Sequence, residues 1–227
     1  QAETAANAFY GRGEFESAYS DLRVLCCLPG LTLQIATLSS QNITSLYDLK
    51  GKSIALEAHG GAGAIITKKI LETCGLSQNN DYTSLTLPLP TAVELMNKNQ
   101  IHAVSFLSAG PSAAFLELAG SKPLKMLSLD ENLIESFVSE NPFWYRDTLA
   151  PHTYPDQAET VLTIGTPTIL VTHKDLPDKD AYAISSAILD RITEISALTM
   201  SEPPPSGKGG NGGLPFHPGA RRENSFL

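Results

Sequence analysis

The hydrophobic positions along this chain switch repeatedly between the spacing of strands and the spacing of helices. Leu31, Leu33 and Ile35 alternate with more polar neighbours, which predicts a strand over residues 31–38. By the same criteria we predict strands at 22–28, 53–56, 101–107, 123–129, 161–164 and 167–171, and helices at 3–10, from 64 to 74, from 91, and at 112–119, 131–139 and 180–198. Strands that alternate with helices are typical of an α/β fold.

Two turns rich in small residues each connect a predicted strand to a predicted helix. The first spans residues 59–63 and the second spans residues 108–111. A helix start leaves backbone N–H groups without partners and carries about half a positive charge, which suits a carboxylate or phosphate. If both turns follow parallel strands of one sheet, they lie at the same carboxyl edge, where α/β sheets bind ligands. The alternative is that both turns are ordinary connections.

Charge and hydropathy exclude several classes of partner. The chain has a net charge of −8 and no cluster of Lys and Arg, which argues against binding to nucleic acid or to an anionic membrane surface. The longest apolar runs, such as 168–171, are too short to cross a bilayer. Hydrophobic residues make up 42% of the chain, so a packed core is expected over most of its length.

The sequence offers little for catalysis or metal binding. No serine lies in a G-x-S-x-G motif, and neither the histidines nor the cysteines have the spacing of metal ligands. His102 reads as a strand residue, and His217 as a structural hydrogen-bond partner. We therefore predict no catalytic residue, no metal and no cofactor.

Tyr154 is the aromatic residue that we expect closest to a ligand. It follows the aromatic cluster 143–145 and lies in a loop just before a predicted strand. Aromatic side chains with a polar tip often form the walls of small-molecule clefts. Phe143 and Trp144 are more simply explained as cover for the edge of a lobe.

Six segments in order resemble the TAXI receptors, the extracytoplasmic solute-binding components of TRAP-type transporters. The final segment, Leu-Pro-Phe-His-Pro-Gly-Ala, is the most specific, and the resemblance runs from the first residues to the last. The segments are residues 21–25, 45–52, 60–63, 101–111, 153–157 and 214–220.

The resemblance implies a type II periplasmic-binding fold, with two α/β lobes joined by two crossing strands near 33–38 and 166–171. Residues 1–37 and 168–227 would form one lobe, and residues 38–167 the other. Family members carry a further segment before the position of Gln1, so we expect the lobe built from the chain ends to be incomplete.

The function implied is capture of a small solute, of the kind of glutamate or another carboxylate, outside the cytoplasm, and its delivery to the membrane subunits of a TRAP transporter. The ligand-binding residues expected are Gly60, Gly61, Ala62, Gly63, Ser108, Gly110 and Tyr154. Two alternatives stay open. The first is a small-molecule enzyme on the same fold, since fold does not fix function, and the second is a remnant without a working cleft.

Three positions depart from the family pattern. The glycine turn lacks the two hydroxyl side chains of the family's Gly-Ser-Gly-Thr, so it offers only backbone donors. Glu57 stands where the family has a small residue, and its carboxylate would repel an anionic ligand unless it points away. His102 replaces an aspartate.

Overall fold

The computed structural model describes residues 1–57, 61–199 and 211–220. The chain divides into two compact units. The end unit comprises Gln1–Leu31, Glu140–Tyr145 and Gly165–Leu227, and the middle unit comprises Thr32–Ser139 and Arg146–Ile164. The boundaries between the two units fall within the two long strands, after Leu31 and after Ile164. The sequence analysis placed the corresponding lobe boundaries after residues 37 and 167.

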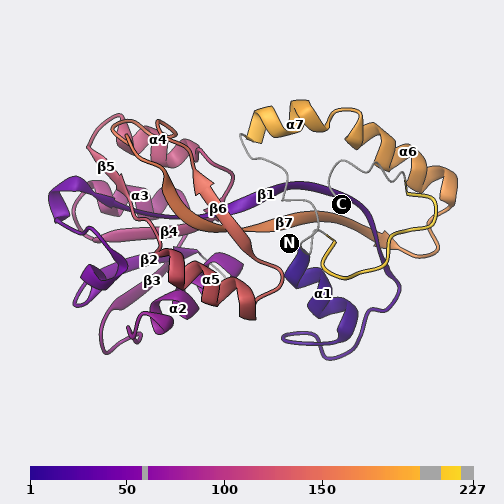
Figure 1. Cartoon of the computed structure of the whole chain (residues 1–227), viewed down its shortest axis with the longest axis horizontal. Helices are drawn as coiled ribbons and strands as arrows, with labels where there is room; N and C mark the ends of the chain where they lie inside the picture. The colour runs from indigo at the N-terminus through magenta and orange to yellow at the C-terminus, as the bar shows by residue number, and fades with distance from the viewer. Residues whose placement is uncertain (58–60, 200–210, 221–227) are drawn as a thin grey trace. The chain divides into compact units, whose positions relative to one another are not determined.

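In the described ranges, seven strands form one mixed sheet in the order β3-β2-β4-β1-β7-β6, with β5 also paired to β1. A mixed sheet with helices between its strands confirms the predicted α/β class. The two long strands, β1 and β7, each contribute residues to both units (Figure 1). The strands are β1 (Leu22–Leu38), β2 (Ser53–Glu57), β3 (Thr83–Leu87), β4 (Ala103–Ser108), β5 (Leu124–Met126), β6 (Tyr145–Leu149) and β7 (Val161–His173).

Four of the described α-helices connect successive strands, as the alternating pattern predicts, and the others precede the first strand or follow the last one. The α-helices are α1 (Ala2–Tyr10), α2 (Ala62–Thr73), α3 (Leu89–Asn97), α4 (Ala113–Ala119), α5 (Glu131–Glu140), α6 (Asp178–Leu189) and α7 (Ile192–Thr199), with short 3₁₀ turns η1 (Ser39–Gln41) and η2 (Leu46–Leu49).

Strand β4 lies at the centre of the middle unit and is buried on both faces. It pairs in parallel with β2 and antiparallel with β1. Val104 and Phe106 belong to an apolar cluster that includes residues of α3 and α4. Ser105 and Leu107 contact α2 instead. Because successive strand residues point to opposite faces, α2 covers one face of β4 while α3 and α4 cover the other.

A pair of buried hydroxyls attaches α2 to β4. Thr67 Oγ1 donates a hydrogen bond to the carbonyl oxygen of Gly63 at 2.6 Å and lies 2.7 Å from Ser105 Oγ. Thr67 has a single hydroxyl hydrogen, which the carbonyl receives, so Ser105 must be the donor of the second bond. Both residues are 0% exposed, so the Ser105 hydroxyl depends on Thr67 as its acceptor.

The end unit packs the first helix against both long strands. Ala2 and Ala6 of α1 share an apolar cluster with Val24 of β1 and Ile169 of β7. Gly11, with φ 62°, ends α1 in the left-handed conformation that glycine adopts at low cost.

Strand β1 is one element of 17 residues, so the prediction of two strands, 22–28 and 31–38, was wrong at their junction. Gly30 stays extended within the strand rather than forming a turn. A Cβ at Gly30 would lie 2.1 Å from Tyr145 Oη and 3.0 Å from the carbonyl oxygen of Thr166. Glycine at this position therefore allows Tyr145 and Thr166 to approach the backbone of β1 closely. The two segments predicted at 161–164 and 167–171 likewise form one continuous strand, β7.

Two predictions about helix ends were also wrong. The helix expected from 180 to 198 is interrupted between α6 and α7, where the N–H of Arg191 bonds to the carbonyl of Ile188 in a tighter 3₁₀-type turn. The helix expected from residue 91 already begins at Leu89, so Thr91 and Glu94 lie inside α3 and do not form a cap at its start. Glu94 instead pairs with Lys98 on the surface.

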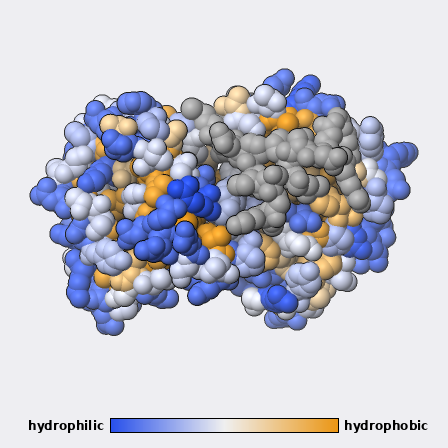
Figure 2. Space-filling model, in the orientation of Figure 1, coloured by the Kyte–Doolittle hydropathy of each residue, from blue (hydrophilic) through white to orange (hydrophobic). Residues whose placement is uncertain are grey.

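Hydrophilic residues predominate over the described surface on the viewed face, with apolar residues in smaller groups between them (Figure 2). Among the residues that the structure describes, no helix has the length and apolar character needed to cross a membrane.

We expect Thr67→Val to lower the free energy of unfolding by about 1–3 kcal/mol, because it leaves the buried Ser105 hydroxyl without its acceptor. The matched control is Thr73→Val on the same helix, where an exposed Thr73 makes the equivalent bond to the carbonyl of Lys69. Urea unfolding of the two variants measures the difference, and equal effects would show that the Thr67–Ser105 contact contributes little.

Candidate functional site

Both turns lie at the same edge of the sheet in the middle unit. Strand β2 pairs in parallel with β4, with Ile54 opposite Ala103 and Leu56 opposite Ser105. Residues 61–63 follow the carboxyl end of β2, and residues 109–112 follow the carboxyl end of β4. The sequence analysis required that both turns follow parallel strands of one sheet, and this condition is met.

The first turn delivers the chain into α2, with Gly61 as the N-cap residue. Gly61, Ala62 and Gly63 lie at the helix start as predicted, and Gly60 falls outside the described residues. The N–H of Gly63 donates a hydrogen bond of 3.1 Å to Glu57 Oε2. The carboxylate of Glu57 thus points toward the helix start and occupies the position expected for the anionic group of a ligand.

Glycine at two positions makes room for the Glu57 side chain. A Cβ at Gly61 would lie 2.5 Å from Glu57 Cδ, and a Cβ at Gly63 would lie 2.5 Å from Glu57 Oε2. The Cβ at Gly63 would also come within 3.0 Å of the backbone nitrogen of Leu107 in β4. Side chains with hydroxyl groups at positions 61 and 63 would therefore collide with Glu57, so glycine in this turn and Glu57 in the strand fit together.

Burial is the main influence on the protonation of Glu57. It raises the pKa of the Glu57 carboxyl above its ordinary value, while the hydrogen bond from the Gly63 N–H acts in the opposite direction. The carboxylate is only partly buried.

The second turn is held by a buried glutamine of β1. Gln34 is 1% exposed, and its Nε2 lies within hydrogen-bond distance of Ser108 Oγ (2.9 Å), the Ser108 carbonyl (3.2 Å) and the Ala109 carbonyl (3.1 Å). Gly110 is buried beside this amide, since a Cβ there would lie 3.6 Å from Gln34 Nε2. The arrangement fixes the backbone that leads into α4.

Tyr154 completes this frame from the other side. Its hydroxyl donates to Gln34 Oε1 and accepts a 2.7 Å hydrogen bond from the N–H of Ser112, the N-cap residue of α4. The side chain is 1% exposed, and burial raises the pKa of Tyr154 to about 12. Tyr154 thus lies at the predicted turn, where it positions the backbone with a hydroxyl that is already engaged.

The sequence analysis missed Gln34 as a functional candidate. It counted Gln34 among the polar positions that alternate with apolar ones along the strand. In the structure β1 is buried on both faces over 32–38, so alternation does not distinguish an exposed polar residue from a buried one. The usable signal is a buried amide, which needs several hydrogen-bond partners.

His102 lies at the opposite end of the same strands. It precedes β4, and its Nδ1 accepts a 3.2 Å hydrogen bond from the N–H of Ser53, the first residue of β2. Desolvation and, secondarily, the charge of Lys52 lower the pKa of His102. The structure therefore does not bring His102 to the two turns.

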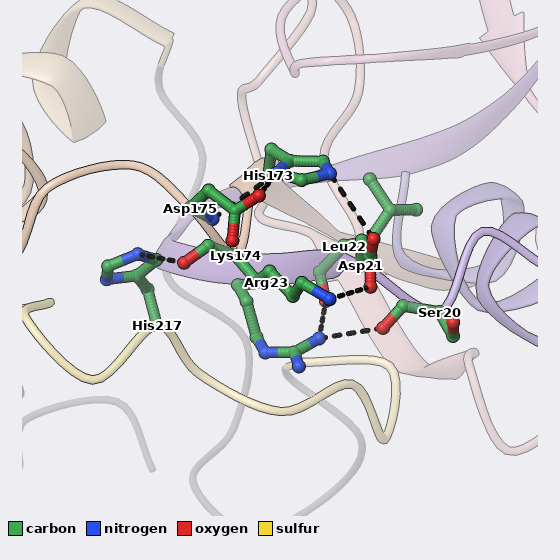
Figure 3. A network of polar contacts seen from close by, with 8 residues as sticks. All are labelled: Ser20, Asp21, Leu22, Arg23, His173, Lys174, Asp175 and His217. Atoms are coloured by element: carbon green, nitrogen blue, oxygen red, sulfur yellow. Dashed lines mark hydrogen bonds and ion pairs between the residues drawn. The ribbon is translucent and has the colours of Figure 1, made fainter.

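The C-terminal segment of the described chain is a structural attachment within the end unit (Figure 3). His217 is 1% exposed, its Nδ1 accepts from the N–H of Gly219 at 3.2 Å, and its Nε2 lies 3.2 Å from the carbonyl of Lys174. The acceptor role of Nδ1 places the hydrogen on Nε2, which donates to that carbonyl. This agrees with the structural role predicted for His217.

Asp21 joins the same region of the end unit at the surface. Its carboxylate pairs with Lys174 at 2.9 Å and lies 3.4 Å from His173 (Figure 3). These side chains are roughly half exposed, so the ion pairs contribute little to stability. In the described part of the chain, no three residues of His, Cys, Asp or Glu are grouped so as to hold a metal ion.

The sequence model of the NMT1-like family matches residues 1–223 of this chain. Among solved structures, the chain is similar to the periplasmic aliphatic sulphonate binding protein SsuA from Escherichia coli, with 14% identity, a TM-score of 0.43, and coverage of 79% of this chain and 50% of that one. A periplasmic binding protein of an ABC transporter from Brucella ovis, with glutathione bound, has 10% identity, a TM-score of 0.47, and coverage of 79% and 46%.

A third similar structure is the probable amino-acid ABC transporter extracellular-binding protein ytmK from Bacillus subtilis. It has 14% identity and a TM-score of 0.48, with coverage of 78% of this chain and 62% of that one. The chain thus spans between about half and just under two thirds of the length of these proteins.

We expect Tyr154→Phe to lower the free energy of unfolding by about 1–3 kcal/mol, because it leaves Gln34 Oε1 and the Ser112 N–H buried without their partner. Tyr82→Phe is the matched control. Tyr82 is equally buried in the middle unit, at 3% exposed, but among the described residues its hydroxyl has no hydrogen-bond partner. Denaturant unfolding should show little loss for Tyr82→Phe, and a comparable loss in both variants would contradict the role given to the Tyr154 hydroxyl.

Proposed function

Because this chain belongs to the NMT1-like family, we propose that it is the solute-binding part of an extracytoplasmic receptor, which captures a small molecule and catalyses no reaction on it. The observation that carries the proposal is the convergence of two strand-to-helix turns at the carboxyl edge of the parallel strands β2 and β4. Such an edge is where open α/β sheets bind small molecules. The residues proposed to contact the solute are those predicted at this edge, which are Gly60, Gly61, Ala62 and Gly63 in the first turn and Ser108 and Gly110 in the second.

The rigidity of the second turn supports binding. Gln34 and Tyr154 hold residues 108–112 through hydrogen bonds from two different segments of the middle unit. A turn that is already fixed loses little conformational entropy when a solute binds to it. Ser108 and Gly110 are therefore proposed to contact the solute, with Tyr154 as the residue that positions them.

The arrangement of the reactive side chains supports a receptor rather than an enzyme. The Ser108 hydroxyl accepts from Gln34 Nε2, and within the described part of the chain no general base is hydrogen-bonded to it, while His102 is bonded to Ser53 at the other end of the strands. A nucleophilic serine requires a base within hydrogen-bond reach. We infer that the site holds its solute without covalent chemistry.

The resemblance to the TAXI receptors supports the finer parts of the proposal. These are a solute that contains a carboxylate, as glutamate does, a periplasmic or otherwise extracytoplasmic location, and delivery to the membrane subunits of a TRAP-type transporter. Two of the similar solved structures belong to ABC transporters instead. Copurification with the membrane subunits that accept the solute would decide between these two transporter classes.

We expect L-glutamate, or another small carboxylate in a calorimetric panel, to bind saturably and to be recovered unchanged. At a hundredfold excess over the dissociation constant, the ligand should raise the free energy of unfolding by about 2.7 kcal/mol. No binding across acidic, neutral and basic solutes would contradict a receptor function, and turnover of a bound solute would favour an enzyme.

We expect Ser108→Ala to weaken binding of that solute by roughly threefold to tenfold, since it removes one hydrogen-bonding group from the proposed site. Ser139→Ala is the matched control, because Ser139 is exposed on α5 and its hydroxyl donates to the carbonyl of Ser136, remote from both turns in the sequence. Equal affinities of the two variants would remove Ser108 from the site.

A further inference from the structure

Glu57 provides α2 with an anion that belongs to the chain itself. Its Oε2 accepts the Gly63 N–H at 3.1 Å, in the geometry that the carboxylate of a ligand would adopt at a helix start. The contact is specific to these residues, because a Cβ at Gly61 or Gly63 would come within 2.5 Å of the Glu57 carboxyl group. Glycine at positions 61 and 63 therefore leaves the space that the Glu57 side chain occupies.

The charge at this end of α2 is reversed as a result. A helix start contributes about half a positive charge, and an ionised carboxylate contributes a full negative one. The sum is negative, so a second carboxylate placed there is repelled, whereas an ammonium group is attracted. A solute that approaches the start of α2 therefore meets the Glu57 carboxylate, which already accepts the Gly63 N–H.

We infer that Glu57 determines the specificity of this site: it excludes a solute carboxylate from the start of α2 and pairs instead with a cationic group of the solute. This rests on the proposed function and narrows its solute class. The solute would then be an amino acid or another zwitterion, with its ammonium group toward Glu57 and its carboxylate toward the second turn. A plain dicarboxylate lacks the group that Glu57 selects.

L-glutamate and glutarate test this directly, because they have the same carbon skeleton and differ by the ammonium group. Isothermal titration of the whole chain should show glutamate binding at least tenfold more tightly than glutarate. Glu57→Gln keeps the shape of the side chain and removes its charge, so the preference should fall to within about threefold. Glu72→Gln, an exposed carboxylate further along α2, is the control and should keep the full preference.

Glutarate that binds the unaltered chain as tightly as glutamate would overturn the inference, as would a preference that survives Glu57→Gln. If the unaltered chain binds neither compound, the acidic solute of the proposed function is wrong. The inference is then decided by acetate and by the NMR signal of the Gly63 amide. If acetate shifts this signal saturably in Glu57→Gly but not in the unaltered chain, Glu57 excludes a carboxylate from the start of α2. The same response in the unaltered chain and in Glu57→Gly overturns the inference.

Discussion

The parallel pairing of β2 with β4 is the constraint on which the candidate site depends. Because the two strands run in the same direction and are direct neighbours, the turns that follow them emerge at one edge. The buried Thr67–Ser105 hydroxyl pair then attaches α2 to β4 close to that edge. Gln34 from β1 fixes the turn after β4, so three adjacent strands contribute to one small region of the middle unit.

The two turns are built differently, and the difference has chemical meaning. The second turn is held by neutral groups, since a buried amide and a phenol bond to its backbone. The first turn includes a carboxylate that accepts a backbone N–H at the helix start. The edge thus combines a neutral frame with a negative group, an asymmetry that suits a solute with two unlike ends.

Much of the fold and part of the site could be predicted from the sequence. Hydrophobic spacing located the helices of the middle unit, and small residues marked both turns. The break predicted between the strands 22–28 and 31–38 was wrong, because Gly30 lies within one continuous strand and leaves room for Tyr145 and β7. Gln34 was missed for a related reason, since burial on both faces of β1 is a property of the assembled sheet.

The orientation of Glu57 is the clearest case of information that the sequence does not contain. Its charge was evident, but the direction of its side chain depends on the space that Gly61 and Gly63 leave beside β4. The His217 segment shows the opposite case. There the sequence analysis predicted a structural hydrogen-bond partner, and His217 bonds to the N–H of Gly219 and to the carbonyl of Lys174.

The central claim is that a small solute binds at the edge formed by these two turns. The most direct measurement is a titration of the isotope-labelled chain with L-glutamate, followed through the amide signals in NMR spectra. The account predicts saturable shifts that are largest at Gly61 to Gly63 and at Ser108 to Gly110. Saturable shifts confined to other parts of the chain, or no saturable shift at all, would contradict it.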